Sequence, residues 1–372
     1  MPETAPPATP LPSLHARWIA SALDGPVPHE RRATCDDCAM LVKAERPLLP
    51  TEYAFNPATK CCTYIPELPN FLLGRILADD DPALAPGRAA VEARLADDNV
   101  ITPFGLGRPP GYMVFYRQAS DQSFGRLKAL RCPYYVEAGG GRCGIWKHRE
   151  SMCATWYCKH DRGAVGMRFW RALHQLLFAL ERALTVWCVL QLDVGTAALR
   201  RLFPPAFVRQ GPSDFLESLG EVPDRAELWG PWRGREREFF VESARRVEAL
   251  AWPELLALAG PETHVHLSLV REAHRELLSG ELPEALRVNA MRLVAVDGTN
   301  GQFWTYSNLD GLEMPTRLLD VIHHFDGRPT REAMRAIADD SGVDLGERVV
   351  RQLADFEVLV PVEALSRKGE KR

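Results

Sequence analysis

The sequence lacks the marks of several common protein classes. Its net charge is only −4 over 372 residues, so no excess of one sign would attract nucleic acid or an anionic membrane. No basic segment followed by an apolar run opens the sequence, and we therefore expect no secretory signal and a cytoplasmic location. The composition is otherwise that of a globular protein with two or three domains.

Long apolar runs without charge are also missing. The most apolar segment, residues 169–192, carries Arg171, His174, Glu181 and Arg182. Its apolar residues recur at intervals of three and four, the pattern of one apolar helix face. We therefore expect a packed helix here rather than a membrane span.

Motifs that would identify a reaction do not stand out. The sequence has no phosphate-binding loop, no dinucleotide fingerprint and no Ser–His–Asp set above background, and it lacks the CxxxCxxC spacing of radical enzymes. These patterns leave open whether the chain is an enzyme, and no catalytic residue is assigned.

Cysteine is the abundant exception. Eight of the nine cysteines lie between residues 35 and 158. An odd total and a reducing compartment argue against a disulfide framework, and clustered thiols in such a compartment more often bind metal or react. The candidate metal ligands are Cys35, Cys38, Cys61, Cys62, Cys132, Cys143, Cys153 and Cys158. Cys188 lies in the apolar helix and is expected to be a core residue.

The cysteine spacing allows more than one interpretation. Cys35 and Cys38 form a CxxC pair, which binds one metal ion from a tight turn or serves redox chemistry. Cys61 and Cys62 are adjacent, so their side chains diverge and suit two centres, or one ligand and one packed thiol. Eight thiols would suffice for two four-thiolate centres. Buried unligated cysteines and a purely redox dithiol are the alternatives, but metal binding explains the density best.

The segment around the last cysteines is basic and contains a glycine run. Residues 126–162 hold eight Lys or Arg against three Asp or Glu, the reverse of the whole chain. These cations and the amides of Gly139–Gly141 would lower thiol pKa values and favour bound thiolates. We expect His148 and His160 to support the site or lie at the surface rather than to ligate metal.

These motifs resemble the YkgJ-like cysteine-cluster family, whose members are described as zinc- or iron-chelating domains. Besides the CxxC and the adjacent pair, the matching residues within 31–165 are Cys132, Pro133, Cys143, Ile145, Arg149 and Cys153. The chain departs from the family pattern in having 22 residues between Cys38 and Cys61, Trp146 in place of Tyr, and Glu150 in place of Pro. The resemblance implies bound zinc or iron, with a [4Fe-4S] cluster as one form of the iron.

The sequence divides into four regions by composition and periodicity. We expect a flexible Pro/Ala-rich tail over 1–30, a Cys-rich zinc- or iron-chelating domain over 31–165, a helical region over 166–280, and a separate small domain over 285–364. Helices are expected near Pro69 and Pro86. The predicted class is α+β, with an irregular metal-stabilised Cys-rich domain, a helical middle region and a small winged-helix-like C-terminal domain.

The C-terminal region has a recognisable order of elements. Two strands, 291–297 and 302–308, flank the turn 298–301, and three short helices and a closing apolar run follow. This order resembles, more loosely, the PqqD-like winged-helix modules that hold a leader peptide for peptide-modifying enzymes. His323 and His324 fall on a predicted helix, where adjacent side chains point about 100° apart, so a shared metal is not expected.

The charge of this region distinguishes between nucleic acid and peptide as partners of a winged helix. Residues 285–364 hold eight Arg and no Lys against thirteen Asp or Glu, the wrong sign for a phosphate-binding face. We therefore expect a peptide or protein partner through this domain, captured by an edge strand, and neither nucleic acid nor membrane. A scaffold or dimerisation module is the alternative.

Together these patterns predict a cytoplasmic metal-binding protein. Its eight-cysteine domain would bind zinc or an iron–sulfur cluster and act in peptide or protein modification. The alternatives are a non-catalytic, metal-stabilised adaptor that binds peptide, and an iron–sulfur or thiol redox enzyme.

Overall fold

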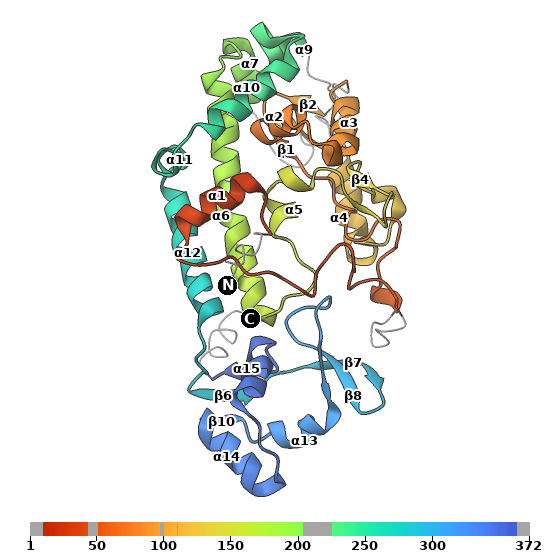
Figure 1. Ribbon diagram of the computed structural model, residues 1–372, viewed down its shortest axis with the longest axis vertical. Helices are drawn as coiled ribbons and strands as arrows, with labels where there is room; N and C mark the ends of the chain where they lie inside the picture. Colours follow the sequence, from red (N-terminus) through yellow and green to blue (C-terminus); the bar gives the residue numbers. More distant parts are fainter. Residues whose placement is uncertain (1–9, 44–50, 97–99, 110, 204–224, 363–372) are drawn as a thin grey trace, which may run out of the picture. The chain divides into compact units, whose positions relative to one another are not determined.

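The computed structural model describes residues 10–43, 51–96, 100–109, 111–203 and 225–362 (Figure 1). Helices and small antiparallel sheets both occur, which confirms the α+β class. Chain contacts divide the protein into two compact units. Unit 1 is Met1–Pro28, Phe55–Trp156 and Leu173–Leu269, and unit 2 is His29–Ala54, Tyr157–Ala172 and Val270–Arg372. These bounds differ from the four expected regions because segments of the two units alternate along the chain.

Unit 1 begins with a helix where the sequence indicated a flexible tail. Helix α1 (Ser13–Ala22) buries Leu14, Trp18 and Ile19, which share one face at helical spacing. The Trp18 ring lies 6.3 Å from the ring of Phe71. The Pro-rich composition of the first twelve residues hid this short apolar stripe.

Two helices pack closely in the core of unit 1. Helix α2 (Asn70–Ala78) begins directly after Pro69, as predicted, and lies against α10 (Glu236–Glu248) (Figure 1). A Cβ atom on Gly74 would lie only 1.9 Å from the Phe240 carbonyl oxygen, so a glycine is required at this crossing. Next to it, the rings of Trp229, Phe239 and Phe240 meet edge to face with centroids 5.5 to 5.7 Å apart.

Short elements make up the rest of unit 1. Its further helices are α3 (Ala85–Arg94), α4 (Tyr112–Ser123), α5 (Ser151–Thr155), α7 (Thr196–Leu202), α9 (Arg225–Trp229) and α11 (Trp252–Ala259). One sheet has the order β1 (Leu68–Pro69), β3 (Gly105–Leu106), β2 (Ile101–Thr102), and β4 (Tyr135–Val136) pairs with β5 (Arg142–Cys143). Helix α3 contains Pro86 in its first turn, as predicted, since that position needs no backbone N–H donor.

Two longer helices, α6 (Gly163–Gln191) and α12 (Pro261–Leu278), contribute residues to both units. Helix α6 is long and apolar enough to cross a membrane by length and composition. Within unit 1 its apolar stripe is fully buried and consists of Leu173, Leu176, Leu177, Leu180 and Leu184. This is the burial expected of a packed helix.

Unit 2 holds the predicted C-terminal elements around one apolar core. The sheets are β10 (Asp326–Pro329), β6 (Ala285–Val288), β11 (Leu359–Pro361), and β7 (Arg292–Asp297), β8 (Asn300–Trp304), β9 (Leu312–Pro315), all antiparallel. The helices are α13 (Leu319–Ile322), α14 (Thr330–Ser341) and α15 (Glu347–Asp355). The hairpin, the helices and the closing strand match the prediction. Strands β6 and β9 were missed, and β10 replaces the expected turn at 326–330.

Candidate metal centre and the adjoining cavity

Five of the eight predicted metal ligands belong to unit 1. They are Cys61, Cys62, Cys132, Cys143 and Cys153. The amide of Cys132 donates to the Cys62 carbonyl at 2.9 Å, and the β4–β5 hairpin places Cys143 opposite Tyr135. Cys132 and Cys143 lie close enough to Cys153 to affect its titration. Three separate segments therefore bring these thiols into one region.

Burial, rather than nearby positive charge, has the larger effect on the pKa values of the thiols in this region. A hydrogen bond with Cys62 and burial raise the pKa of Cys61, and burial raises the pKa of Cys132 to about 12. The pKa of Cys153 is also raised, first by burial and then by the charge of Glu150. The expectation that cations leave these thiols with lowered pKa values is therefore wrong for these three, because the raising effects outweigh the lowering by Lys60 at Cys61 and by Arg94 at Cys132.

The basic side chains of the segment have other partners. Lys147 forms an ion pair with Asp81, and Arg131 forms one with Glu137. Lys60, next to Cys61, donates to the carbonyl of Gly141 at 2.8 Å. Lys60 lowers the pKa of Cys61, but by less than the hydrogen bond with Cys62 and burial raise it.

The two histidines near the cysteines bind carboxylates. His148 is buried in unit 1, with Nε2 2.8 Å from Asp79 Oδ2, and burial is the main cause of its lowered pKa. In unit 2, the backbone amide of His160 donates to Asp310 Oδ2 at 2.8 Å, and the His160 ring Nδ1 lies 3.7 Å from the same oxygen. Both histidines are buried rather than at the surface, and their carboxylate partners fix their positions.

The thiol groups are of the type that binds soft metals, but their side chains do not converge on one position. All nine cysteines are free of disulfides. Thiolates suit zinc and iron–sulfur clusters. Among the described residues, however, no three His, Cys, Asp or Glu side chains are placed to hold one ion. Ligation would therefore require the five thiols of unit 1 to turn further toward one another.

The other cysteines are distributed differently. Cys35, Cys38 and Cys158 belong to unit 2, so the eight candidate ligands divide five and three between the units. Cys188 is buried in α6, with Sγ 3.9 Å from the Ser243 carbonyl oxygen, and is the core residue expected.

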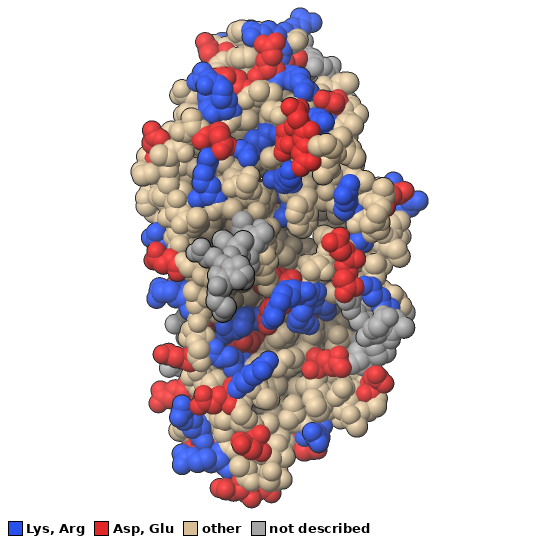
Figure 2. All heavy atoms as spheres, in the orientation of Figure 1, with Lys and Arg blue, Asp and Glu red and all other residues tan. Residues whose placement is uncertain are grey.

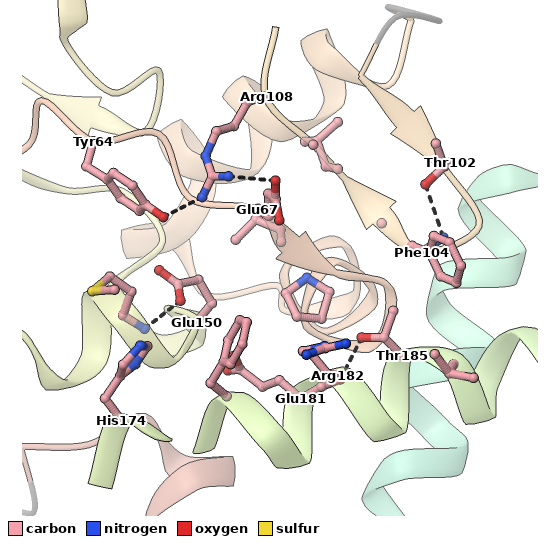
Figure 3. A pocket seen from close by; sticks show the side chains of 18 of the residues that line it. Tyr64, Glu67, Thr102, Phe104, Arg108, Glu150, His174, Glu181, Arg182 and Thr185 are labelled. Atoms are coloured by element: carbon pink, nitrogen blue, oxygen red, sulfur yellow. Dashed lines mark hydrogen bonds and ion pairs between the residues drawn. The ribbon is translucent and has the colours of Figure 1, made fainter. Parts of the chain in front are cut away.

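A cavity of about 750 Å³ in unit 1 is lined in part by Glu150 and Met152, which precede Cys153 in the chain (Figure 3). Its polar lining includes Tyr64, Glu67, Arg108, Glu150, His174 and Glu181. Arg108 reaches Glu67 at 2.6 Å and also donates to the Tyr64 hydroxyl, so its charge is paired with a carboxylate of the same cavity lining. Burial is the main cause of a lowered pKa at His174.

Two buried carboxylates join the cavity to the helix that carries Cys153. Glu150 caps α5, accepting the amide of Cys153 at 2.9 Å, and also accepts the Cys153 thiol. Glu181 Oε1 accepts the Ser151 amide at 2.8 Å and lies 3.0 Å from His15 Nε2. Burial and the charge of Glu181 raise the pKa of Glu150 to about 7. These contacts fix the position of α5.

Sequence reasoning missed these carboxylates as site residues. A signal was present, because His174, Glu181 and Thr185 recur at spacings of seven and four along a largely apolar helix. Such spacing marks a polar stripe on one helix face. The sequence does not show that a cavity lies over that stripe.

Unit 2 has a groove beside its edge strand β9, which pairs only with β8 in the described structure. The groove has a volume of about 610 Å³, and its apolar lining includes Leu312, Met314, Leu345, Val349 and Leu353. It therefore runs between β9 and α15.

The histidine pair of unit 2 departs from the expected geometry. The rings of His323 and His324 lie 4.3 Å apart between centroids and 31° from parallel. Helix α13 ends at Ile322, so the pair lies beyond the regular helix in which side chains would diverge. His324 Nε2 lies 3.5 Å from Asp340 Oδ2.

Comparison with known proteins finds no family model, no curated protein and no solved structure that matches the chain.

Proposed function

We propose that unit 1 is a metal-binding domain similar to the YkgJ-like family and that five of its cysteines provide the ligands. They are Cys61, Cys62, Cys132, Cys143 and Cys153. The observation that carries this proposal is that thiols from three separate segments share one region without forming disulfides. Zinc or iron, the latter in a [4Fe-4S] cluster, is the group that such ligands hold. Cys35, Cys38 and Cys158 are the candidate ligands of unit 2.

Burial keeps the Cys132 and Cys153 thiols protonated, whereas a bound metal would hold them as thiolates. Zinc would join the three segments, whereas an iron–sulfur cluster would also carry an electron. The Glu150 and Glu181 carboxylates keep α5, and with it Cys153, in place. Free thiols and a bound metal both suit the cytoplasm, where we place the protein. A metal that only stabilises an adaptor, and a redox enzyme, are the alternatives to a role in peptide or protein modification.

Metal analysis of the full chain after anaerobic purification tests this proposal. Iron with sulfide and absorption near ~400 nm would support a cluster, and colourless protein with stoichiometric zinc would support a structural ion. Cys143→Ser and Cys153→Ser should each lose metal, whereas Cys188→Ala, which alters a core thiol, should keep it. Folded, metal-free protein from an anaerobic preparation supplemented with zinc and iron would refute the proposal.

A second candidate function belongs to unit 2, which we propose to be a winged-helix-like module that captures an extended peptide. Its support is the groove between β9 and α15, where Val343 and Val349 remain partly exposed. An added strand would pair with the free edge of β9, and apolar side chains would fill the groove.

Charge favours a peptide that is apolar with basic flanks. The groove contains Glu313, Asp320 and Asp344 against Arg317, and residues 285–364 carry a net charge of about −5 by sequence. On the face drawn in Figure 2, Lys and Arg side chains are interspersed with Asp and Glu. This distribution supports a peptide partner over nucleic acid.

An array of twelve-residue peptides that vary in charge and apolar content, probed with the full chain, tests the second proposal. Apolar peptides with basic flanks should bind, and Val349→Asp in the groove should weaken them at least tenfold. Val296→Asp on β7, an exposed valine outside the groove, should leave binding unchanged. Binding that is the same for acidic and basic peptides, or is unaffected by Val349→Asp, would reject peptide capture at this groove.

A further inference from the structure

The cavity of unit 1 is lined by both apolar and polar side chains (Figure 3). Its apolar wall includes Leu68, Phe104, Leu106, Phe178 and Phe203. The rings of Phe104 and Phe203 meet edge to face at 5.3 Å. The carboxylates of Glu150 and Glu181 belong to the polar wall. A volume of about 750 Å³ lies within the range of small-molecule sites.

Glu181 has an unused acceptor in this cavity wall. The residue is only 3% exposed, and its Oε1 atom is occupied by the Ser151 amide and by His15. Its Oε2 atom accepts no hydrogen bond from the residues that the structure describes. Because Glu181 lines the cavity, a ligand that enters the cavity can donate a hydrogen bond to this oxygen.

The ion-pair partner of Glu181 in the described structure is the His15 imidazole, which reaches Oε1. In the described part of the chain, neither Glu150 nor Glu181 forms an ion pair with Lys or Arg. Arg108 is already held by Glu67 and Tyr64, and Arg182 lies 5.7 Å from the centroid of the Phe178 ring. Because buried negative charge needs a partner, the cavity favours a ligand that carries positive charge.

We propose that this cavity binds an organic amine, a molecule with a protonated ammonium group at one end and an apolar body at the other. The ammonium group donates to Glu181 Oε2 and to Glu150, and the body packs against Phe104, Leu106 and Phe178. An inorganic cation would leave the apolar wall unused, and an anion would meet two carboxylates.

Isothermal titration of the full chain with three matched probes tests the charge preference. The probes 4-phenylbutylamine, 4-phenylbutanol and 5-phenylpentanoate share one apolar body and differ in the charge at its end. The amine should bind at least tenfold more tightly than the alcohol, as expected for a charge-assisted hydrogen bond, and more tightly still than the carboxylate. Equal affinity for all three, or no binding of the amine by the folded chain, would overturn the proposal.

Three variants distinguish the contribution of the carboxylates to binding from that of the apolar side chains. Glu181→Gln keeps an acceptor for the Ser151 amide and removes the charge, so it should weaken the amine at least tenfold and leave the alcohol unchanged. Phe178→Ala, at a side chain that is 44% exposed, should weaken both probes by a similar factor. Glu238→Gln, on the exposed face of α10, should change neither affinity. Unchanged amine affinity in folded Glu181→Gln, or unchanged affinity for both probes in Phe178→Ala, would overturn the assignment; the second test holds even if Glu181→Gln fails to fold.

Discussion

Arg162 and Asp355 form a two-point ion pair in unit 2. Both Nε and Nη2 of Arg162 donate to the Asp355 carboxylate, the latter at 2.9 Å, and the third nitrogen donates to the Leu277 carbonyl. Arg162 closes the basic stretch whose cations the sequence assigned to bound thiolates. Its guanidinium instead links α15 and α12 to the start of α6, so this charge has a role in stability.

Replacing Arg162 should therefore destabilise unit 2. The pair is largely buried and each donor is matched to an acceptor, so we expect Arg162→Ala to lower the free energy of unfolding by about 3 kcal/mol. Arg162→Lys keeps the charge but loses the two-point geometry, and should cost about half as much. Thermal or urea unfolding measures both values.

Arg168 provides the matched control. It pairs with Glu276 in the same unit, but both side chains are about half exposed. We expect Arg168→Ala to cost less than about 1 kcal/mol, because water screens such pairs. Equal losses for Arg162→Ala and Arg168→Ala would contradict the assigned role of the Asp355 pair.

A second prediction concerns the close approach of α2 and α10. By helix propensity, Gly74→Ala would stabilise α2 by about 1 kcal/mol. The added Cβ would instead lie 1.9 Å from the Phe240 carbonyl oxygen, a backbone atom that cannot turn aside. We expect the clash to win and Gly74→Ala to destabilise the protein by about 3 kcal/mol.

Gly280→Ala is the control for this substitution. A Cβ there meets no atom within 4 Å, and its φ lies outside the left-handed region. Urea unfolding of the two variants should therefore show a large loss for Gly74→Ala and a change of less than about 1 kcal/mol for Gly280→Ala. Similar stability of Gly74→Ala and the unaltered chain would rule out the tight crossing.

The sequence predicted those elements whose signals are local. Pro69 and Pro86 mark the starts of α2 and α3, and the turn at 298–301 marks the β7–β8 hairpin. Strand β9 has only four residues, too few for an alternating pattern to stand out, and three of the four residues of β10, Asp326, Gly327 and Pro329, favour turns. Their pairing comes from tertiary contacts.

The candidate site shows the same division between local and tertiary information. Cysteine density located all eight candidate thiols, but their five-to-three distribution depends on segments that alternate between units. The cavity was hidden because Glu181 lies on the predicted apolar helix, while His15, which contacts it, lies in a region expected to be a tail. Sequence spacing places Glu181 on a helix face but does not identify what covers that face.

Acid should weaken unit 2 through Asp310. Burial raises the pKa of this carboxyl, but hydrogen bonds from His160 and Tyr306 and the charges of Arg32 and Lys159 together hold it below its usual range. A carboxyl with a lowered folded-state pKa stabilises the protein above its unfolded pKa of about 3.9, and this contribution disappears as the pH falls through the folded value.

Asp310→Asn should therefore cost about 2 kcal/mol at pH 7, and its difference from the unaltered chain should shrink below pH ~4. Unfolding curves across this pH range measure the difference. The contribution of Glu30 to stability changes with pH in the opposite direction, because burial raises its pKa and favours the protonated form. A constant cost of Asp310→Asn from pH 7 to pH 3 would show that its charge does not matter.

The last prediction concerns the reactivity of Cys132. Burial raises the pKa of this thiol to about 12, and the thiolate is the form that alkylates. In metal-free protein near neutral pH, its thiolate fraction should be roughly a thousandfold lower than that of a free cysteine of pKa ~8.5. Time courses with iodoacetamide, followed by peptide mass spectrometry, should show slow labelling of Cys132 that becomes rapid when the chain is unfolded in urea.

Bound metal also slows alkylation, so the measurement must be made on chelator-treated protein that still gives the folded circular dichroism spectrum. Rapid labelling of Cys132 in that folded, metal-free chain would contradict its burial.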